Sequence, residues 1–287
     1  MAPATANSTQ EFPHPITRGR SLLALIRFTL SILLLSAVLS SLVAPLIGWP
    51  WWKVWRRCVS VAAGLSLWLC ITKFERRSFR AYGLSWSGAG KRQFLFGLGL
   101  GSAMLAVVIG LGLLSGAYRL EVTPDHFRLW RTVIGFLPVA IMVSVLEELV
   151  FRGFILQHLL AWHKAVAVIL TSFLYAVVHL KIPTVNVGIS LELTGLFLLG
   201  CVLAIAYLQT GSLALSIGLH SVLAYGARVN KLLFQFPNSY SSISWLMGTS
   251  RLVNGLISWV ALFVVGALIM WRAKRFQQSK QIGGVSP

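Results

Sequence analysis

The chain has 287 residues, and 56% of them are hydrophobic, whereas about 45–50% is usual for soluble domains. Its mean hydropathy of +0.77 excludes an ordinary soluble domain and favours a membrane protein. The formal net charge is +18, from 25 Lys and Arg against seven Asp and Glu. The basic residues gather at the ends of apolar segments, where they anchor helices to lipid head groups, so the charge indicates membrane topology and argues against a nucleic-acid partner.

The apolar runs predict an all-α, polytopic transmembrane bundle. A helix that crosses the hydrocarbon core needs about 20 largely apolar residues. Eight segments are expected to cross the membrane, at 22–47, 57–73, 94–117, 132–160, 164–181, 191–209, 212–236 and 252–272.

The predicted segments divide the chain into four parts. These are a disordered N-terminal arm (1–20), N-terminal transmembrane helices (21–131), a core that holds most of the unusual polar residues (132–236), and a last helix with a basic tail (237–287). Eight crossings place both termini on one side, and that side carries the larger share of Lys and Arg. The positive-inside rule then predicts that both termini are cytoplasmic. We expect an integral protein of a bacterial cytoplasmic membrane.

The fourth segment contains two adjacent carboxylates and an arginine, Glu147, Glu148 and Arg152. A charge at the centre of a membrane costs about 3 kcal/mol on insertion scales, so ionisable residues there are functional candidates. Glu148 and Arg152 are four residues apart, which predicts an ion pair on one helix face. Glu147 is rotated by about 100° and has no counter-charge on its own helix, so it is the candidate acid or base. The alternative, that both glutamates line an interhelical salt-bridge network, stays open.

Two histidines lie deep in apolar runs, His179 in the fifth segment and His220 in the seventh. The other histidines fall in arms, loops or segment ends. One carboxylate and two imidazoles on three helices can activate water, with groups to bind a metal or to stabilise an oxyanion. Packing roles for the histidines, and a proton relay in a transporter, are alternatives that the residues leave open. Three cysteines, Cys58, Cys70 and Cys201, lack the spacing of a thiolate metal site.

This order of residues resembles the CPBP intramembrane protease family, also called the Abi or CAAX-protease family, which includes the Rce1-type prenyl-protein endopeptidases. The family motif EExxxR matches Glu147, Glu148 and Arg152. The motif FxxxH matches His179, with Tyr175 in place of Phe. The resemblance implies that Glu148, Arg152 and Tyr175 support the site structurally.

The third family motif, HxxxN, matches His220, but Ala224 stands where Asn is usual. The resemblance, which covers about 132–226, implies an endopeptidase in which Glu147 activates water, His179 assists and His220 supports the oxyanion together with the Asn position. Ala224 cannot donate a hydrogen bond, and losing one oxyanion donor costs about 100-fold in rate. Ser221 or a water could replace the missing donor.

The resemblance leaves the cofactor and the exact role as expectations. Members of the family have been described as metalloproteases and as metal-free glutamate proteases. We favour the metal-free mechanism, and the alternative is zinc held by Glu147, His179 and His220. The expected partners are the lipid bilayer and a membrane protein or lipidated peptide substrate. Because Ala224 weakens the site, the second functional hypothesis is a catalytically impaired scaffold or immunity-type binding protein.

Overall fold

The structure, a computed structural model, describes residues 17–179, 187–236, 242–249 and 252–283. Its α-helices are α1 (Arg18–Ile47), α2 (Trp51–Trp68), α3 (Gly88–Leu114), α4 (His126–Glu148), α5 (Gln157–Leu159), α6 (Lys164–Val178), α7 (Val187–Thr210), α8 (Ala214–Leu233), α9 (Ser242–Met247) and α10 (Leu256–Gly283). Two π-helical stretches, η1 (Leu69–Phe74) and η3 (Leu149–Leu156), continue α2 and α4, and η2 (Phe79–Tyr82) is a 3-10 turn. The short strands β1 (Arg119–Leu120) and β2 (Phe234–Gln235) pair antiparallel.

The predicted all-α polytopic bundle is confirmed. In the described part of the chain, six helices are long and apolar enough to cross a membrane: Arg18–Ile47, Trp51–Phe74, Gly88–Leu114, His126–Leu159, Gly188–Thr210 and Leu256–Arg275. Of the other two predicted segments, α6 is apolar but has only 15 residues, and α8 is not among the six. The orientation of the bundle in the membrane stays a prediction.

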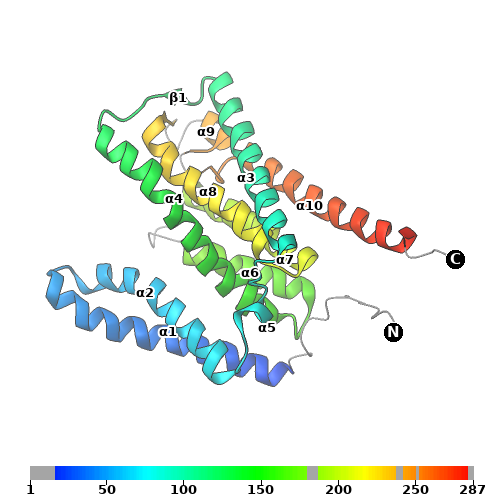
Figure 1. The fold of residues 1–287 in the computed structure, drawn as a ribbon. Helices are drawn as coiled ribbons and strands as arrows, with labels where there is room; N and C mark the ends of the chain where they lie inside the picture. Colours follow the sequence, from blue (N-terminus) through cyan, green and yellow to red (C-terminus); the bar gives the residue numbers. More distant parts are fainter. Residues whose placement is uncertain (1–16, 180–186, 237–241, 250–251, 284–287) are drawn as a thin grey trace.

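The helix α8 occupies the centre of the bundle between α3 and α4 (Figure 1). Every residue from Ala214 to Ser221 is buried. A helix that is surrounded by other helices need not present an apolar face to lipid, which explains its lower hydropathy. The hairpin of α1 and α2 lies along one side of the bundle and meets it at η3 and α5 (Figure 1).

Several helices begin earlier than their apolar runs predicted. The fourth starts at His126 instead of 132, because the Asp125 side chain accepts a hydrogen bond from the Arg128 N–H at 2.8 Å. The third starts at Gly88 instead of 94, where Ser87 caps the Gly90 N–H at 3.2 Å. Capping residues satisfy the free N–H groups of a first turn, and hydropathy does not register them. Most of the predicted N-terminal arm lies outside the described residues, as does the end of the fifth segment at 180–181.

Candidate active site

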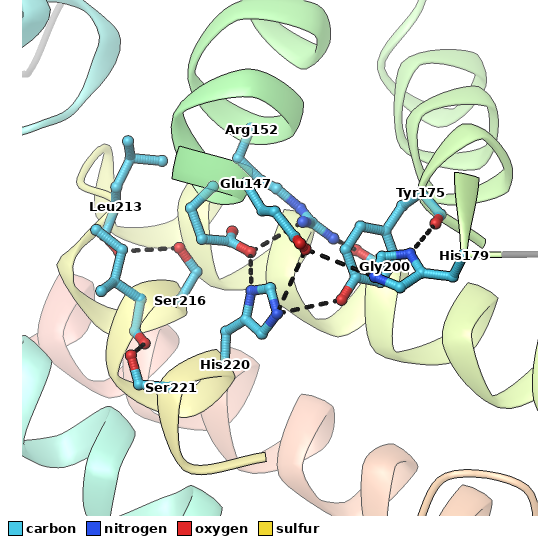
Figure 2. A network of polar contacts seen from close by, with 11 residues as sticks. Glu147, Arg152, Tyr175, His179, Gly200, Leu213, Ser216, His220 and Ser221 are labelled. Atoms are coloured by element: carbon cyan, nitrogen blue, oxygen red, sulfur yellow. Dashed lines mark hydrogen bonds and ion pairs between the residues drawn. The ribbon is translucent and has the colours of Figure 1, made fainter. Parts of the chain in front are cut away.

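The polar residues of the fourth segment lie where its α-helix turns into a π-helix. Glu147 and Glu148 end α4, and Arg152 lies within η3. A π-helical stretch inserts an extra residue into an α-helix and is frequent at functional sites. Figure 2 shows these side chains converging with residues from α6, α7 and α8.

Arg152 and Glu148 form the predicted ion pair, with Nη1 and Oε1 2.9 Å apart and both side chains fully buried. The second guanidinium nitrogen, Nη2, donates to the Gly200 carbonyl at 3.1 Å. The guanidinium carbon also lies 4.6 Å from the centroid of the Tyr175 ring, a cation–π contact. Glu148 therefore belongs to a buried network that joins η3 to α6 and α7.

Glu147 faces both predicted histidines. Its Oε2 lies 3.7 Å from His179 Nε2 and 3.6 Å from His220 Nε2. The side chains of Glu147 and His179 are 25% and 30% exposed, whereas that of His220 is 6% exposed. Both separations exceed a direct hydrogen bond but leave room for a water that contacts two of the groups. Glu147, His179 and His220, which the sequence analysis grouped by their chemistry, thus lie close together in the structure.

Each imidazole is oriented by a partner at Nδ1. His179 Nδ1 is 2.7 Å from the Tyr175 carbonyl oxygen, which can only accept, so this nitrogen carries the hydrogen. His220 Nδ1 is 2.9 Å from the Glu148 carboxylate. In the neutral rings, this arrangement leaves the Nε2 lone pairs directed at Glu147. The Tyr175 hydroxyl can donate to His220 Nε2, at 3.3 Å. Such outer partners fix tautomer and ring orientation.

Comparison with known proteins finds a family match for this part of the chain. Residues 129–225 match the Rce1-like family, described as type II CAAX prenyl endopeptidase Rce1-like. This match agrees with the resemblance of the motifs to the CPBP/CAAX-protease family. A 127-residue stretch is 28% identical to an uncharacterized 24.3 kDa protein of Escherichia coli, and the alignment covers 41% of this chain and 56% of that protein. The chain thus spans little more than half the length of this curated relative. No solved structure matches.

The CAAX-protease segment carries Ala224 one helical turn after His220 on α8. The proposed replacement for its missing donor, Ser221, is wrong for this structure. Its hydroxyl donates to the Ile217 carbonyl at 2.7 Å and lies on the side of α8 away from Glu147 (Figure 2). A serine hydroxyl in a helix often bonds back to the preceding turn, and the residue order alone does not reveal it.

Gly200 is a site residue of the CAAX-protease segment that sequence reasoning missed. A Cβ at this position would lie 2.8 Å from Ser172 Cβ and 2.9 Å from Ser172 Cα. Only glycine lets α7 approach α6 so closely, and this approach brings the Gly200 carbonyl to Arg152. A small residue inside an apolar helix is the typical signal of such a contact, but it does not identify the partner.

Replacing Gly200 by Ala should therefore destabilise the CAAX-protease segment by about 1–3 kcal/mol, because the added methyl overpacks the contact with Ser172. The measurement is the free energy of unfolding in detergent micelles. Gly110→Ala is the matched control, because its Cβ would meet nothing within 4 Å and alanine favours a helix by about 1 kcal/mol over glycine. Equal effects of the two substitutions would contradict the proposed role of Gly200.

The metal-free expectation for this site stays a prediction. In the described ranges, no group of three or more His, Cys, Asp and Glu side chains is placed to hold a metal ion. This applies to Glu147, His179 and His220, which approach one another but do not form such a group.

Proposed function

We propose that this chain is an intramembrane endopeptidase of the CAAX-protease type that hydrolyses a peptide bond of a membrane-associated protein or lipidated peptide. The observation that carries the proposal is the approach of Glu147 to two imidazole nitrogens, at 3.6 and 3.7 Å, inside the segment that matches an endopeptidase family. The Glu147 side chain is 25% exposed, whereas Glu148 and Arg152 behind it are fully buried. Its Oε2 is buried and has no hydrogen-bond partner among the described residues, so it can accept a hydrogen bond from a bound water.

In the proposed mechanism, Glu147 acts first as a base. One hydrogen of a bound water points to Glu147 Oε2 and the other to His179 Nε2, which orients the water. The carboxylate takes the first proton while the water oxygen attacks the scissile carbonyl carbon, and a tetrahedral oxyanion forms. Glu147 then returns the proton to the leaving amine as the C–N bond breaks. The products are a carboxylic acid and an amine, and Glu147 is a carboxylate again.

The oxyanion needs a hydrogen-bond donor, and Tyr175 can supply one. This chain has lost the donor at Ala224, where the family has Asn, but has a hydroxyl at Tyr175, where the family has Phe. That hydroxyl lies 3.3 Å from His220 Nε2, so one donor is absent and another is present beside the same imidazole. We infer that the Tyr175 O–H turns from His220 to the oxyanion in the transition state.

Tyr175→Phe should then lower kcat by about 100-fold, because it removes one oxyanion donor. The double variant Tyr175→Phe/Ala224→Asn, which restores both family residues, should recover much of that loss. Cleavage of a membrane-tethered peptide in proteoliposomes measures both. A Tyr175→Phe protein with full activity would contradict the role of the hydroxyl.

Ala224 also favours a second candidate function, a membrane scaffold or immunity-type binding protein that uses the residues around Glu147 without catalysis. The deciding experiment follows cleavage of a membrane-tethered peptide library by the purified full chain, with and without a chelator. Cleavage that survives the chelator supports the metal-free protease, and cleavage abolished by it and restored by zinc would overturn the metal-free mechanism. No cleavage by the native chain, together with activity in Ala224→Asn, would instead establish the binding role.

A further inference from the structure

A polar cavity of about 370 Å³ lies between the first turns of α1, the end of η1 and α5. It shares no lining residue with the site around Glu147. Its walls carry three arginines, Arg20, Arg27 and Arg77, and an acid–imidazole pair, Glu75 and His158. The volume lies in the range of about 300–1,000 Å³ that is usual for small-molecule sites.

The cavity lining includes a part-buried acid–imidazole pair that the sequence did not predict. Glu75 Oε1 is 2.7 Å from His158 Nε2, and the Tyr82 hydroxyl donates to the other oxygen of Glu75. The side chains of Glu75 and His158 are 18% and 1% exposed. His158 lies at the end of the fourth segment, where α1 and η2 cover it.

Glu75 contributes less negative charge than an ordinary glutamate. Burial raises the pKa of its carboxyl to about 7, against the opposing effect of Arg77. At neutral pH, a large fraction of these carboxyls is therefore protonated. The three arginines then give the cavity a net positive charge.

Two buried polar atoms of the cavity walls have no hydrogen-bond partner. They are Arg77 Nη1 and His158 Nδ1. Buried polar atoms are nearly always hydrogen-bonded, and an unpaired guanidinium nitrogen is especially costly. Arg20 and Arg27 are seven residues apart, two turns along α1, so they lie on one face of that helix. An acceptor-rich anion between Arg77 and this face would satisfy the free guanidinium donor.

We propose that this cavity binds the phosphate group of an anionic membrane phospholipid. Arginine is the preferred partner of phosphate because its planar fork donates two parallel hydrogen bonds. The cavity lies at the end of the span Trp51–Phe74, at the level where lipid head groups lie. Leu23 and Phe74, which are 45% and 54% exposed, continue its wall as an apolar surface for acyl chains. A small soluble anion would make no favourable contact with that apolar wall.

The test titrates the full chain, in a non-ionic detergent, with dioctanoyl phosphatidylglycerol in a calorimeter. Saturable binding is expected for the native protein, and Arg77→Gln should weaken it about 10-fold or more, because a charge-assisted hydrogen bond is lost. Arg80→Gln is the matched control, since Arg80 is an exposed residue of the same loop outside the cavity. Equal weakening by the two variants would show a general surface charge effect and overturn the site. If Arg77→Gln does not fold, Arg27→Gln replaces it.

Two further ligands separate a lipid from a free anion. Inorganic phosphate and glycerol phosphate should bind at least about 10-fold more weakly than the lipid, because they leave the apolar wall unused. Equal affinity for inorganic phosphate would overturn the lipid assignment. Equal affinity for dioctanoyl phosphatidylcholine would overturn the preference for an anionic lipid.

The same titration has a pH signature. Protonation of Glu75 removes the negative charge beside the bound phosphate, so affinity should rise as the pH falls from about 8 to about 6, through the pKa of Glu75 near 7. The lipid phosphodiester itself does not titrate in this range. In Glu75→Gln the affinity should be nearly independent of pH. The other charged or titratable groups around Glu75 are Arg20, Arg27, Arg77, Cys70, Tyr82 and His158. A pH dependence that persists in Glu75→Gln would contradict the role of this carboxyl.

Discussion

Glu147→Gln is expected to lower kcat/KM for a membrane-tethered peptide by about 10²–10⁴-fold, the usual contribution of a general base. Glutamine keeps the shape of the side chain and its approach to His179 and His220, but it cannot take a proton from water. The measurement is single-turnover cleavage in proteoliposomes, so that substrate binding and chemistry are separated.

Glu121→Gln is the matched control for this experiment, because Glu121 is exposed and lies in the loop before α4. It removes the same charge without touching the site and should leave turnover unchanged. Unfolding curves of both variants would show whether the fold is retained. Native turnover in Glu147→Gln would refute the proposed base, whereas the lipid cavity would be unaffected by that result.

Arg152→Met is expected to destabilise the folded protein by about 3–5 kcal/mol, the usual cost of leaving one partner of a buried ion pair alone. Both Arg152 and Glu148 are fully buried, so no solvent can screen the remaining carboxylate. The free energy of unfolding in detergent micelles gives the value. Arg128→Met, an exposed arginine in the first turn of α4, should change it by no more than about 0.5 kcal/mol.

A double variant separates the ion pair from simple packing. Glu148→Leu/Arg152→Met removes both charges, and it should be more stable than Arg152→Met alone, because no unpaired charge stays buried. If the loss of unfolding free energy in the double variant is larger than the sum of the losses in the two single variants, then the pair does not act as a unit. Its catalytic activity should still be low, because His220 Nδ1 has lost the carboxylate that orients its ring.

Local contacts of this site could be predicted from the sequence. Glu148 and Arg152 are four residues apart on one helix, and short spacing determines such pairs almost regardless of the rest of the fold. The approach of Glu147 to His179 and His220 could be predicted only from the chemistry of the three side chains and from the family motifs. Spacing along the chain does not show that residues of three different helices meet.

Contacts that depend on how helices pack could not be predicted. Glu75 and His158 are 83 positions apart, and only the docking of α1 and η2 buries them. The Ser221 hydroxyl donates to the Ile217 carbonyl of its own helix and not toward the site. Residue order alone does not decide between these two hydrogen bonds. The close approach at Gly200 required knowledge of its neighbour Ser172. The first residues of α3 and α4 also differed from the prediction, because a capping side chain, not hydropathy, determines where each helix begins.

The π-helical stretch η3 has a mechanical consequence for both polar sites. Glu147 and Glu148 precede η3, and His158 follows it. The extra residue of η3 therefore determines the rotation about the helix axis between the side chains of the candidate active site and His158 in the proposed lipid cavity. Deleting one residue there would allow a regular α-helix that roughly keeps the present orientation of the residues downstream. Forcing the stretch into a regular α-helix without a deletion would instead rotate everything downstream by about 100°. The Phe154 ring packs at a tilt against those of His158 and Phe28 of α1, with centroids 4.4 and 4.9 Å away. After that rotation it would leave its place in the core. The π-helical turn thus orients the residues on either side of it, so that one continuous helix contributes Glu147 to the candidate active site and His158 to the cavity beside α1.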